Sequence, residues 1–351
     1  MRRWRVRVAA RQVVPVDAQS LVAGGPCAEV GLTMYALAKA AGVTQHRFYR
    51  WVSERKLVAV FGGVYRLPAA PVSFEMRLAA ACLWAGRGAV ASHRAAGALW
   101  RLEDIGAAPA EITVPRLRGV RTPGVDVHRS RDLAAEDVRV RSGIPVTSAA
   151  RTLIDLASVL DPLSLAINVE DAWRRGIATP DWVFRRLSKL RRKGRPGIAA
   201  LNEVLDDCAA RGKPLRSALE VRVWWLIKRS GLPLPIPGCA YEDPERQPGE
   251  IDFAYPGANL AIEAMGFSVH GTRSAFEADT ERTARLAALG WRVFQVTRRQ
   301  VDETPGEVVE RLRRALKGAT SSTRPRAFRD RPSSSLPARS SAPADTWRTP
   351  W

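Results

Sequence analysis

The carboxylates of Asp252 and Glu263 are the side chains whose spacing is best suited to chemistry. They lie in residues 249–270, which read GEIDFAYPGANLAIEAMGFSVH. Apolar and polar residues alternate on both sides of residues 256–259, and the Pro-Gly-Ala-Asn sequence of that short segment is typical of a turn. The pattern therefore predicts a tight β-hairpin with one acidic residue on each strand.

In such a hairpin, Tyr255 pairs with Leu260, and Asp252 then falls opposite Glu263. Directly opposed residues have Cβ atoms roughly 4.5–5.5 Å apart. Two carboxylates at that separation repel each other unless one of them is protonated or a cation lies between them. Because divalent cations such as Mg²⁺ take hard oxygen ligands, the sequence predicts a site for Mg²⁺ or Mn²⁺ held by Asp252 and Glu263.

Glu220 is a third candidate acid, at the start of a helix expected from Ser217 to Gly231. The S-x-x-E spacing from Ser217 to Glu220 is that of a capping box, in which the carboxylate reaches back to the Ser217 amide. The same position also suits a carboxylate that assists the metal pair. The two roles are compatible, and the sequence leaves both open.

His270 completes the predicted catalytic set, and two arginines are predicted to bind DNA. An imidazole with a pKa near 6.5 is suited to take a proton from an attacking water, so His270 is a candidate base. The alternative is a structural histidine at the end of a strand. Arg282 and Arg285 lie on the next expected helix, where we expect them to face either the active site or the DNA backbone.

The elements that must position these residues follow the order helix, strands, helix, strand, helix over residues 217–316. This region resembles the DUF559 group of the PD-(D/E)XK endonuclease superfamily, which is similar to the very-short-patch mismatch repair nuclease. The matching motifs are S-x-L-E at 217–220, I-D-F at 251–253, A-I-E-x-x-G at 261–266, His270, D-x-x-R at 279–282 and L-G-W-x-V-x-x-V-T at 289–297. The resemblance implies a restriction-endonuclease-like αβββαβ core, with Asp252 and Glu263 as metal ligands and Glu220 as a helper.

Met265 departs from the pattern of that superfamily. The superfamily has Lys two residues after the metal-binding Glu, and the DUF559 group commonly has Asp there. Strand alternation places Met265 on the same face as Glu263, so the predicted site has one polar group fewer. The departure favours either a different means of activating water, such as His270, or a weakened nuclease.

Residues 32–67 predict a winged helix-turn-helix. A helix over residues 32–43 ends at a glycine, Thr44 caps a second helix over residues 45–55, and a hairpin follows. The side chains of the second helix that we expect to reach DNA bases or phosphates are Gln45, His46, Arg47 and Arg50. Helix-turn-helix units also serve as plain protein contacts, which is the alternative.

The upstream half resembles the AbiEi family of antitoxins. The matching motifs are G-V-Y at 63–65, S-H-x-x-A-x-x-L at 92–99, E-I-T-V at 111–114 and I-P-V-T-S-x-x-R-T-L-x-D-L at 144–156. This resemblance implies sequence-specific binding of double-stranded DNA in a toxin–antitoxin or phage-defence setting, with a toxin partner or a homodimer. A basic run, RRLSKLRRKGR at 185–195, is either a solvated face or a strip that contacts phosphates.

Composition sets the limits for these assignments. The chain has 351 residues, 46% of them hydrophobic, and a formal net charge of +20, so a polyanion such as DNA is the expected partner. Four scattered cysteines, no apolar stretch near the ~20 residues that span a bilayer, and no signal-peptide core predict a cytoplasmic protein without membrane contact. The expected fold is α/β (α+β), in five regions: a basic extension (1–30), the winged helix-turn-helix (31–70), the AbiEi-like middle domain (71–205), the nuclease-like domain (206–317) and a disordered Ser/Pro/Arg tail (318–351).

Together these patterns predict a metal-dependent DNA endonuclease or nickase whose amino-terminal module binds the duplex. A catalytically weakened, antitoxin-like transcriptional regulator is the first alternative. In that case the nuclease fold is kept for binding or dimerisation, and Met265 favours this reading. A purely structural protein that binds a partner is the second alternative, and it leaves the high positive charge without a role.

Overall fold

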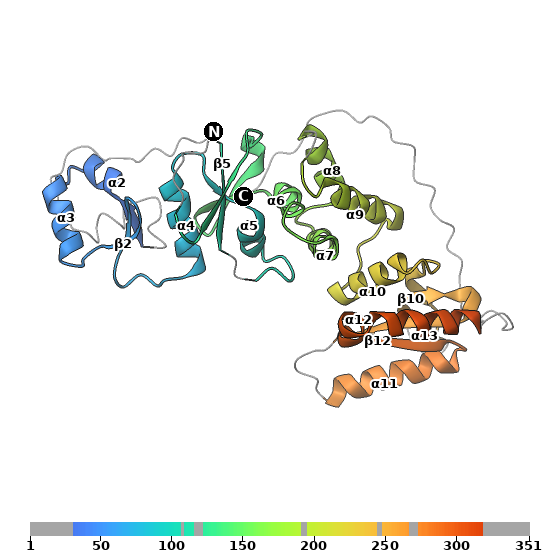
Figure 1. Cartoon of the computed structure of the whole chain (residues 1–351). Coiled ribbons are helices and arrows are strands. Elements are labelled where there is room, and N and C mark those ends of the chain that lie inside the picture. The colour runs from blue at the N-terminus through green and yellow to red at the C-terminus, as the bar shows by residue number, and fades with distance from the viewer. Residues whose placement is uncertain are drawn as a thin grey trace. The chain divides into compact units, whose positions relative to one another are not determined.

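The protein is a mixed α/β chain, here seen in a computed structural model that describes residues 31–106, 109–115, 122–190, 195–243, 248–266 and 273–318. It divides into two compact units, residues 1–231 and 232–351. Three β-sheets lie in the described residues, two in the first unit and one in the second (Figure 1). The predicted α/β class is confirmed at this level.

The first sheet of the first unit has three antiparallel strands in the order β1-β3-β2. Its strands and the two helices beside it are β1 (Leu32–Met34), α2 (Tyr35–Ala40), α3 (Gln45–Ser53), β2 (Val58–Phe61) and β3 (Val64–Arg66). The helix predicted over residues 32–43 therefore begins three residues late, because Leu32–Met34 pair with β3 as an edge strand. Thr44 caps α3 as predicted, and its hydroxyl accepts the N–H of Arg47.

The second sheet of the first unit has five strands in the order β6-β5-β4-β8-β7. Its elements are α4 (Phe74–Ala85), β4 (Val90–Ala91), α5 (His93–Trp100), β5 (Ala110–Val114), β6 (Val125–Arg129), η2 (Ala135–Asp137), β7 (Val138–Arg141) and β8 (Ile144–Thr147). One hydrophobic core joins both sheets, since Leu32 and Val64 of the first belong to the same cluster of buried side chains as Leu78 of α4 and Ile112 of β5.

Five helices follow the second sheet and complete the first unit. They are α6 (Ala149–Leu156), α7 (Pro162–Arg174), α8 (Pro180–Lys189), α9 (Ile198–Arg211) and α10 (Ala218–Arg229). Ser148 caps α6 by accepting the N–H of Arg151. The helix of the S-x-x-E motif, α10, thus groups with the first unit rather than with the strands that carry Asp252 and Glu263.

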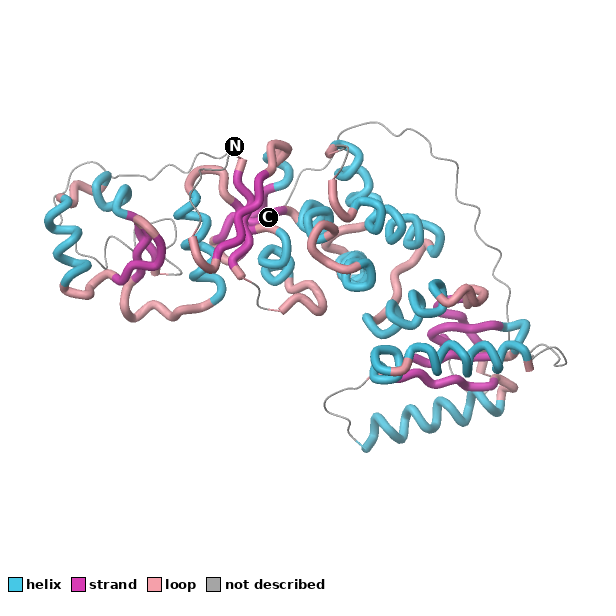
Figure 2. Tube along the Cα trace, viewed as in Figure 1, coloured by secondary structure: helices cyan, strands magenta, loops and turns pink. Residues whose placement is uncertain are grey.

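The second unit holds a four-stranded sheet in the order β12-β11-β10-β9 (Figure 2). Its elements are β9 (Ile236–Tyr241), β10 (Gly249–Tyr255), η3 (Pro256–Ala258), β11 (Leu260–Met265), α11 (Arg273–Ala288), β12 (Arg292–Thr297), α12 (Arg298–Glu303) and α13 (Pro305–Lys317). The predicted hairpin is confirmed, because Tyr255 pairs with Leu260. Strand β12 then adds to β11 in parallel.

Helices α11 and α13 cover opposite faces of this sheet at β12. The Gln295 side chain donates a hydrogen bond to Thr283 of α11. The guanidinium of Arg311 in α13 instead lies over the ring of Phe294, the preceding residue. Since successive side chains of a strand point to opposite faces, the two helices lie on different sides. Within the described residues, no helix combines the length and apolar character that crossing a membrane requires.

Candidate functional site

Asp252 and Glu263 lie side by side in the second unit, on neighbouring antiparallel strands. The pairing of β10 with β11 runs from Tyr255 to Phe253, which is opposite Ile262, and one further step in the same register sets Asp252 against Glu263. Both residues are buried, with 9% and 7% of their surface exposed. The Oδ2 atom of Asp252 accepts the backbone N–H of Ala264 at 2.9 Å, which fixes this carboxylate against β11 beside Glu263.

The pKa of Glu263 is shifted by burial, by Arg282 and by the nearby charge of Asp252. Burial is the largest influence and raises the pKa of the Glu263 carboxyl, because a carboxylate is poorly solvated there. A hydrogen bond from Arg282 lowers the pKa, and the negative charge of Asp252 raises it again. The net result is a pKa above the ordinary value of a glutamate. A perturbed acid beside a second buried carboxylate marks a candidate functional site.

Arg282 of α11 supplies a positive charge to this site. Its Nε donates to Oε2 of Glu263 at 2.9 Å and its Nη2 to Oε1 at 3.2 Å, so the guanidinium grips both carboxylate oxygens. The same Nη2 also donates to the backbone carbonyl of Glu250 in β10. The contact follows from the fold, since Glu263 lies opposite Gln295 in the parallel pair, on the face that α11 covers.

Met265 lies near the end of β11, two residues beyond Glu263 and hence on the same face. It is half-buried and pairs with Thr297 of β12. A thioether in this place offers neither the positive charge of a lysine nor the hard oxygen of an aspartate. Met265 thus follows Glu263 on the same face of β11, at the position where the sequence resemblance leads one to expect a lysine or an aspartate.

The donor atoms present fit a divalent cation of the magnesium type. Asp252 and Glu263 contribute only carboxylate oxygens, both are about nine-tenths buried, and the charge of one acts on the other. Among the described residues, no cluster of three or more His, Cys, Asp or Glu side chains is arranged to hold a metal ion. A cation bound here would have these two carboxylates as its ligands from the described residues.

Glu220 occupies the capping position that its motif predicts. The Ser217 hydroxyl accepts the N–H of Glu220 at 3.1 Å, and the Glu220 carboxylate accepts the N–H of Arg216 at 2.9 Å. The capping box predicts a hydrogen bond from the Ser217 amide to this carboxylate. In the structure the donor is instead the amide of Arg216, one residue earlier. Glu220 is buried in the first unit. His270, the predicted base, lies outside the described residues.

The predicted DNA-contacting side chains share the exposed face of α3. Gln45, His46, Arg47 and Arg50 are all exposed, whereas Phe48 and Trp51 of the same helix are buried in a small aromatic core. The helix thus presents its polar face to solvent for a physical reason, since its apolar face packs against α2 and β3. Glu54, at the end of α3, binds Arg50 at 2.7 Å and Lys56 at 2.8 Å.

Arg285 does not join Glu263. Its Nε donates to the backbone carbonyl of Glu281 on the same helix, α11, one turn earlier. The sequence gives Arg282 and Arg285 the same expected role, but in the structure Arg282 binds Glu263 and Arg285 binds its own helix. Only the spacing of three residues within α11 distinguishes them in the sequence, and that spacing alone does not tell which one reaches β11.

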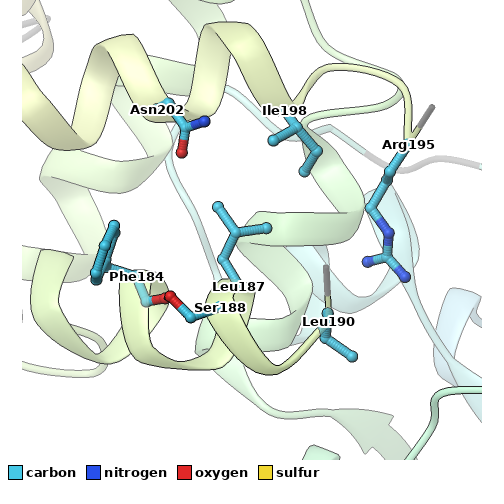
Figure 3. Close-up of a pocket in the computed structure, with 7 residues that line it drawn as sticks. All are labelled: Phe184, Leu187, Ser188, Leu190, Arg195, Ile198 and Asn202. Carbon is cyan, nitrogen blue, oxygen red and sulfur yellow. The ribbon is translucent and has the colours of Figure 1, made fainter. Parts of the chain in front are cut away.

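A small hollow of about 80 Å³ between α8 and α9 lies apart from these residues in the chain (Figure 3). It belongs to the first unit, and its walls are mostly apolar: Phe184, Leu187, Ser188, Leu190, Arg195, Ile198 and Asn202. Four of its lining residues, Leu187, Ser188, Leu190 and Arg195, belong to the basic run at 185–195. Arg186 of that run is engaged by the carboxylate of Asp137, so part of the run is neither a solvated face nor free to contact phosphate.

Comparison with known proteins finds similar sequences but does not assign the chain to a protein family. No protein-family model matches the chain. Two proteins of Mycobacterium tuberculosis strains, "Uncharacterized protein MT2308" and "Uncharacterized protein Rv2248", are each 28% identical to it over 260 residues. The matched segment covers 74% of this chain and 92% of each relative. The similarity therefore spans nearly all of each relative and about three quarters of this chain.

Proposed function

We propose that this protein is a metal-dependent DNA endonuclease or nickase, and that Asp252 and Glu263 hold its Mg²⁺ or Mn²⁺. The observation that carries the proposal is the apposition of these two buried carboxylates on β10 and β11, where the charge of Asp252 acts on Glu263. Here one guanidinium serves Glu263, and the Asp252 carboxylate beside it takes a backbone amide.

The proposed reaction uses a bound cation and several side chains, each with its own role. When bound, a divalent cation polarises the scissile phosphate and lowers the pKa of an attacking water. Asp252 and Glu263 hold that cation, and the bond from the Ala264 amide to Asp252 keeps one ligand from turning away. His270 is the proposed acceptor of the proton released by water. Arg282, already at Glu263, is the cationic side chain of the site.

The finer fold assignments belong to the same proposal. The order β9, β10, β11, α11, β12 supports a restriction-endonuclease-like core over residues 206–317. The order α2, α3, β2, β3 supports a winged helix-turn-helix over residues 31–70, with α3 as its recognition helix. Residues 71–205 are proposed to be an AbiEi-like middle domain.

Double-stranded DNA is the proposed partner. Arg47, Arg50 and Lys56 are exposed on or just after α3, and the chain carries a net charge of +20. Neutralising phosphates with such side chains releases counterions and drives association. The toxin–antitoxin or phage-defence setting, with a toxin or a second copy of the chain as a further partner, rests on the resemblance to AbiEi antitoxins.

A DNA-binding regulator without nuclease activity is the second candidate. The observation that favours it is the bidentate ion pair between Glu263 and Arg282, together with Met265 in place of a lysine or aspartate. In that case the acidic pair is a structural feature of the sheet, and Arg282 is its permanent counter-ion.

Cleavage of supercoiled plasmid by the full-length protein with Mg²⁺ or Mn²⁺ separates the two candidates. The nuclease proposal expects nicked or linear product from the parent protein and none from Asp252→Asn or Glu263→Gln. Glu307→Gln, which removes an exposed carboxylate of α13, is the matched control and retains cleavage. A parent protein that shifts DNA in a gel but leaves the plasmid intact with either metal supports the regulator.

A further inference from the structure

Arg282 holds the same two oxygens of Glu263 that a metal ion needs. Its Nε lies 2.9 Å from Oε2 and its Nη2 lies 3.2 Å from Oε1, so neither oxygen is without a cationic donor. A guanidinium in the bidentate arrangement lies in the plane of the carboxylate, across its open edge. A divalent cation that approaches Glu263 along this edge, to share it with Asp252, competes with the guanidinium for the same oxygens.

We infer that Arg282 closes the metal position, and that it leaves Glu263 when the two carboxylates take up a divalent cation. The inference rests on the proposed function, because it concerns the metal site of that function. It assigns Arg282 a task that its sequence position did not specify. Arg282 positions Glu263 in the resting protein and restrains metal binding until it moves.

Arg282 is the partner that is able to move. One third of its side chain is exposed, whereas the side chain of Glu263 is 9% exposed and fixed in the middle of β11. An arginine side chain on a helix reaches several positions by rotating its four χ angles, without a change in the backbone. Glu263 has no comparable freedom, because β11 is paired on both sides, with β10 and β12.

Once displaced, the Arg282 guanidinium can bind another anion. A divalent cation in place of the guanidinium adds one positive charge beside the two carboxylates. The displaced guanidinium is then free to bind a phosphate, which it recognises with the same bidentate geometry. A DNA phosphate near Glu263 thus draws Arg282 away and favours metal uptake. The half-buried Met265 supplies no positive charge for that phosphate, whereas the Arg282 guanidinium does.

Binding of Mn²⁺ alone to the full-length protein tests this inference. Titration calorimetry, with Mn²⁺ electron paramagnetic resonance as a second readout, compares the parent protein with Arg282→Gln. Removing a charged hydrogen-bond partner of this kind is expected to tighten Mn²⁺ binding on the order of tenfold or more. Arg299→Gln, which breaks an exposed ion pair with Glu303 on α12, is the control of equal charge and leaves the affinity unchanged. Adding Glu263→Gln to Arg282→Gln abolishes the gain.

Equal or weaker Mn²⁺ affinity in Arg282→Gln overturns the inference, and so does a gain that survives Glu263→Gln. Thermal unfolding with and without Mn²⁺ guards against loss of the fold. Arg282→Gln is expected to melt lower than the parent protein without metal and to regain stability with it. If that variant does not fold, Arg282→Lys takes its place. Its single ammonium cannot grip both oxygens, so a smaller gain in affinity is expected, and an unchanged affinity counts against the inference.

These results are separable from those of the cleavage assay. Tighter Mn²⁺ binding in Arg282→Gln without any plasmid cleavage by the parent protein keeps the role of Arg282 and removes the nuclease. Cleavage by the parent protein with unchanged Mn²⁺ affinity in Arg282→Gln keeps the nuclease and removes the role of Arg282.

Discussion

The carboxylate of Asp252 accepts the backbone N–H of Ala264, the residue that follows Glu263 in β11, at 2.9 Å. One acid of the candidate metal pair thus has a second task in the sheet, where it satisfies a backbone amide of the neighbouring strand. Loss of the Asp252 charge and loss of the Asp252 hydrogen bond are therefore distinct events, and they can be separated by the choice of substitution.

Asp252→Asn and Asp252→Ala are expected to lose plasmid cleavage alike but to differ in stability. The asparagine keeps an oxygen that can accept from Ala264, whereas alanine leaves this buried amide without that acceptor, at a cost of about 1–3 kcal/mol. Chemical denaturation of both variants measures the difference. Equal stability of the two variants contradicts the structural task of Asp252, and retained cleavage in either contradicts its role as a ligand.

Glu263→Gln is expected to change the dependence of stability on pH. Burial raises the pKa of Glu263 in the folded protein above its unfolded value, so its contribution to stability is full below the unfolded pKa, near 4.3, and declines as pH rises through the folded pKa. The neutral amide removes this decline. The free energy of unfolding of Glu263→Gln relative to the parent protein should therefore rise between acidic and neutral pH. A constant difference from pH 4 to pH 8 would show that the pKa of Glu263 is not raised.

His93 is expected to make the first unit less stable in acid. Its imidazole stacks on His128 with ring centroids 3.5 Å apart, and burial, followed by the charge of His128, lowers the pKa of His93 to about 3. Since the unfolded histidine takes up a proton near pH 6.5, stability is full above that pH and is lost as pH falls towards the folded pKa, by several kilocalories per mole.

His93→Asn should flatten this acid loss. Asparagine tolerates the positive φ of 50° at this position, and it does not titrate. Denaturation curves of the parent protein and His93→Asn between pH 4 and pH 7 provide the measurement. His46→Asn, an exposed histidine of α3, is the control and should leave the pH dependence as it is. An unchanged slope in His93→Asn argues against a depressed pKa.

Arg47→Ala combined with Arg50→Ala is expected to weaken binding to duplex DNA. Each arginine that neutralises a phosphate contributes about 0.9 to the slope of log affinity against log salt, so the double variant should lose up to about two units of slope. Fluorescence anisotropy at several salt concentrations measures this slope. Arg77→Ala with Arg139→Ala, two exposed arginines on α4 and β7, is the control of equal charge. Equal losses in both double variants indicate a general effect of charge rather than a binding face on α3.

Arg151→Met is expected to destabilise the first unit by about 3–5 kcal/mol, because it leaves the buried Asp155 carboxylate without the arginine that binds both of its oxygens, whereas Asp137 keeps its ion pair with Arg186. Arg151 is 1% exposed and binds Asp155 at 2.9 Å and Asp137 at 3.3 Å. Thermal or chemical unfolding provides the measurement. Arg139→Met, at an exposed site, should change stability little. A small effect of Arg151→Met would mean that hydrophobic contacts of the methionine replace the ion pairs.

Several local features of this protein follow from its sequence alone. Alternating polarity around a Pro-Gly-Ala-Asn turn determines that Tyr255 pairs with Leu260, which in turn sets Asp252 against Glu263. Thr44, Ser148 and Ser217 cap the helices that they precede, because each hydroxyl meets an amide only three residues away. These interactions join residues close in the chain, so the sequence shows both partners at once.

The tertiary structure decided what depends on distant partners. Leu32–Met34 read as the start of a helix, yet they form a strand because β3, some thirty residues later, offers them backbone hydrogen bonds. Arg282 and Arg285 look equivalent in the sequence, and only the parallel pairing of β12 with β11 brings α11 over Glu263 so that Arg282 reaches it. Local spacing in the hairpin sets Asp252 against Glu263. Arg282 reaches Glu263 only because α11 packs on the sheet, and no short stretch of sequence specifies that packing.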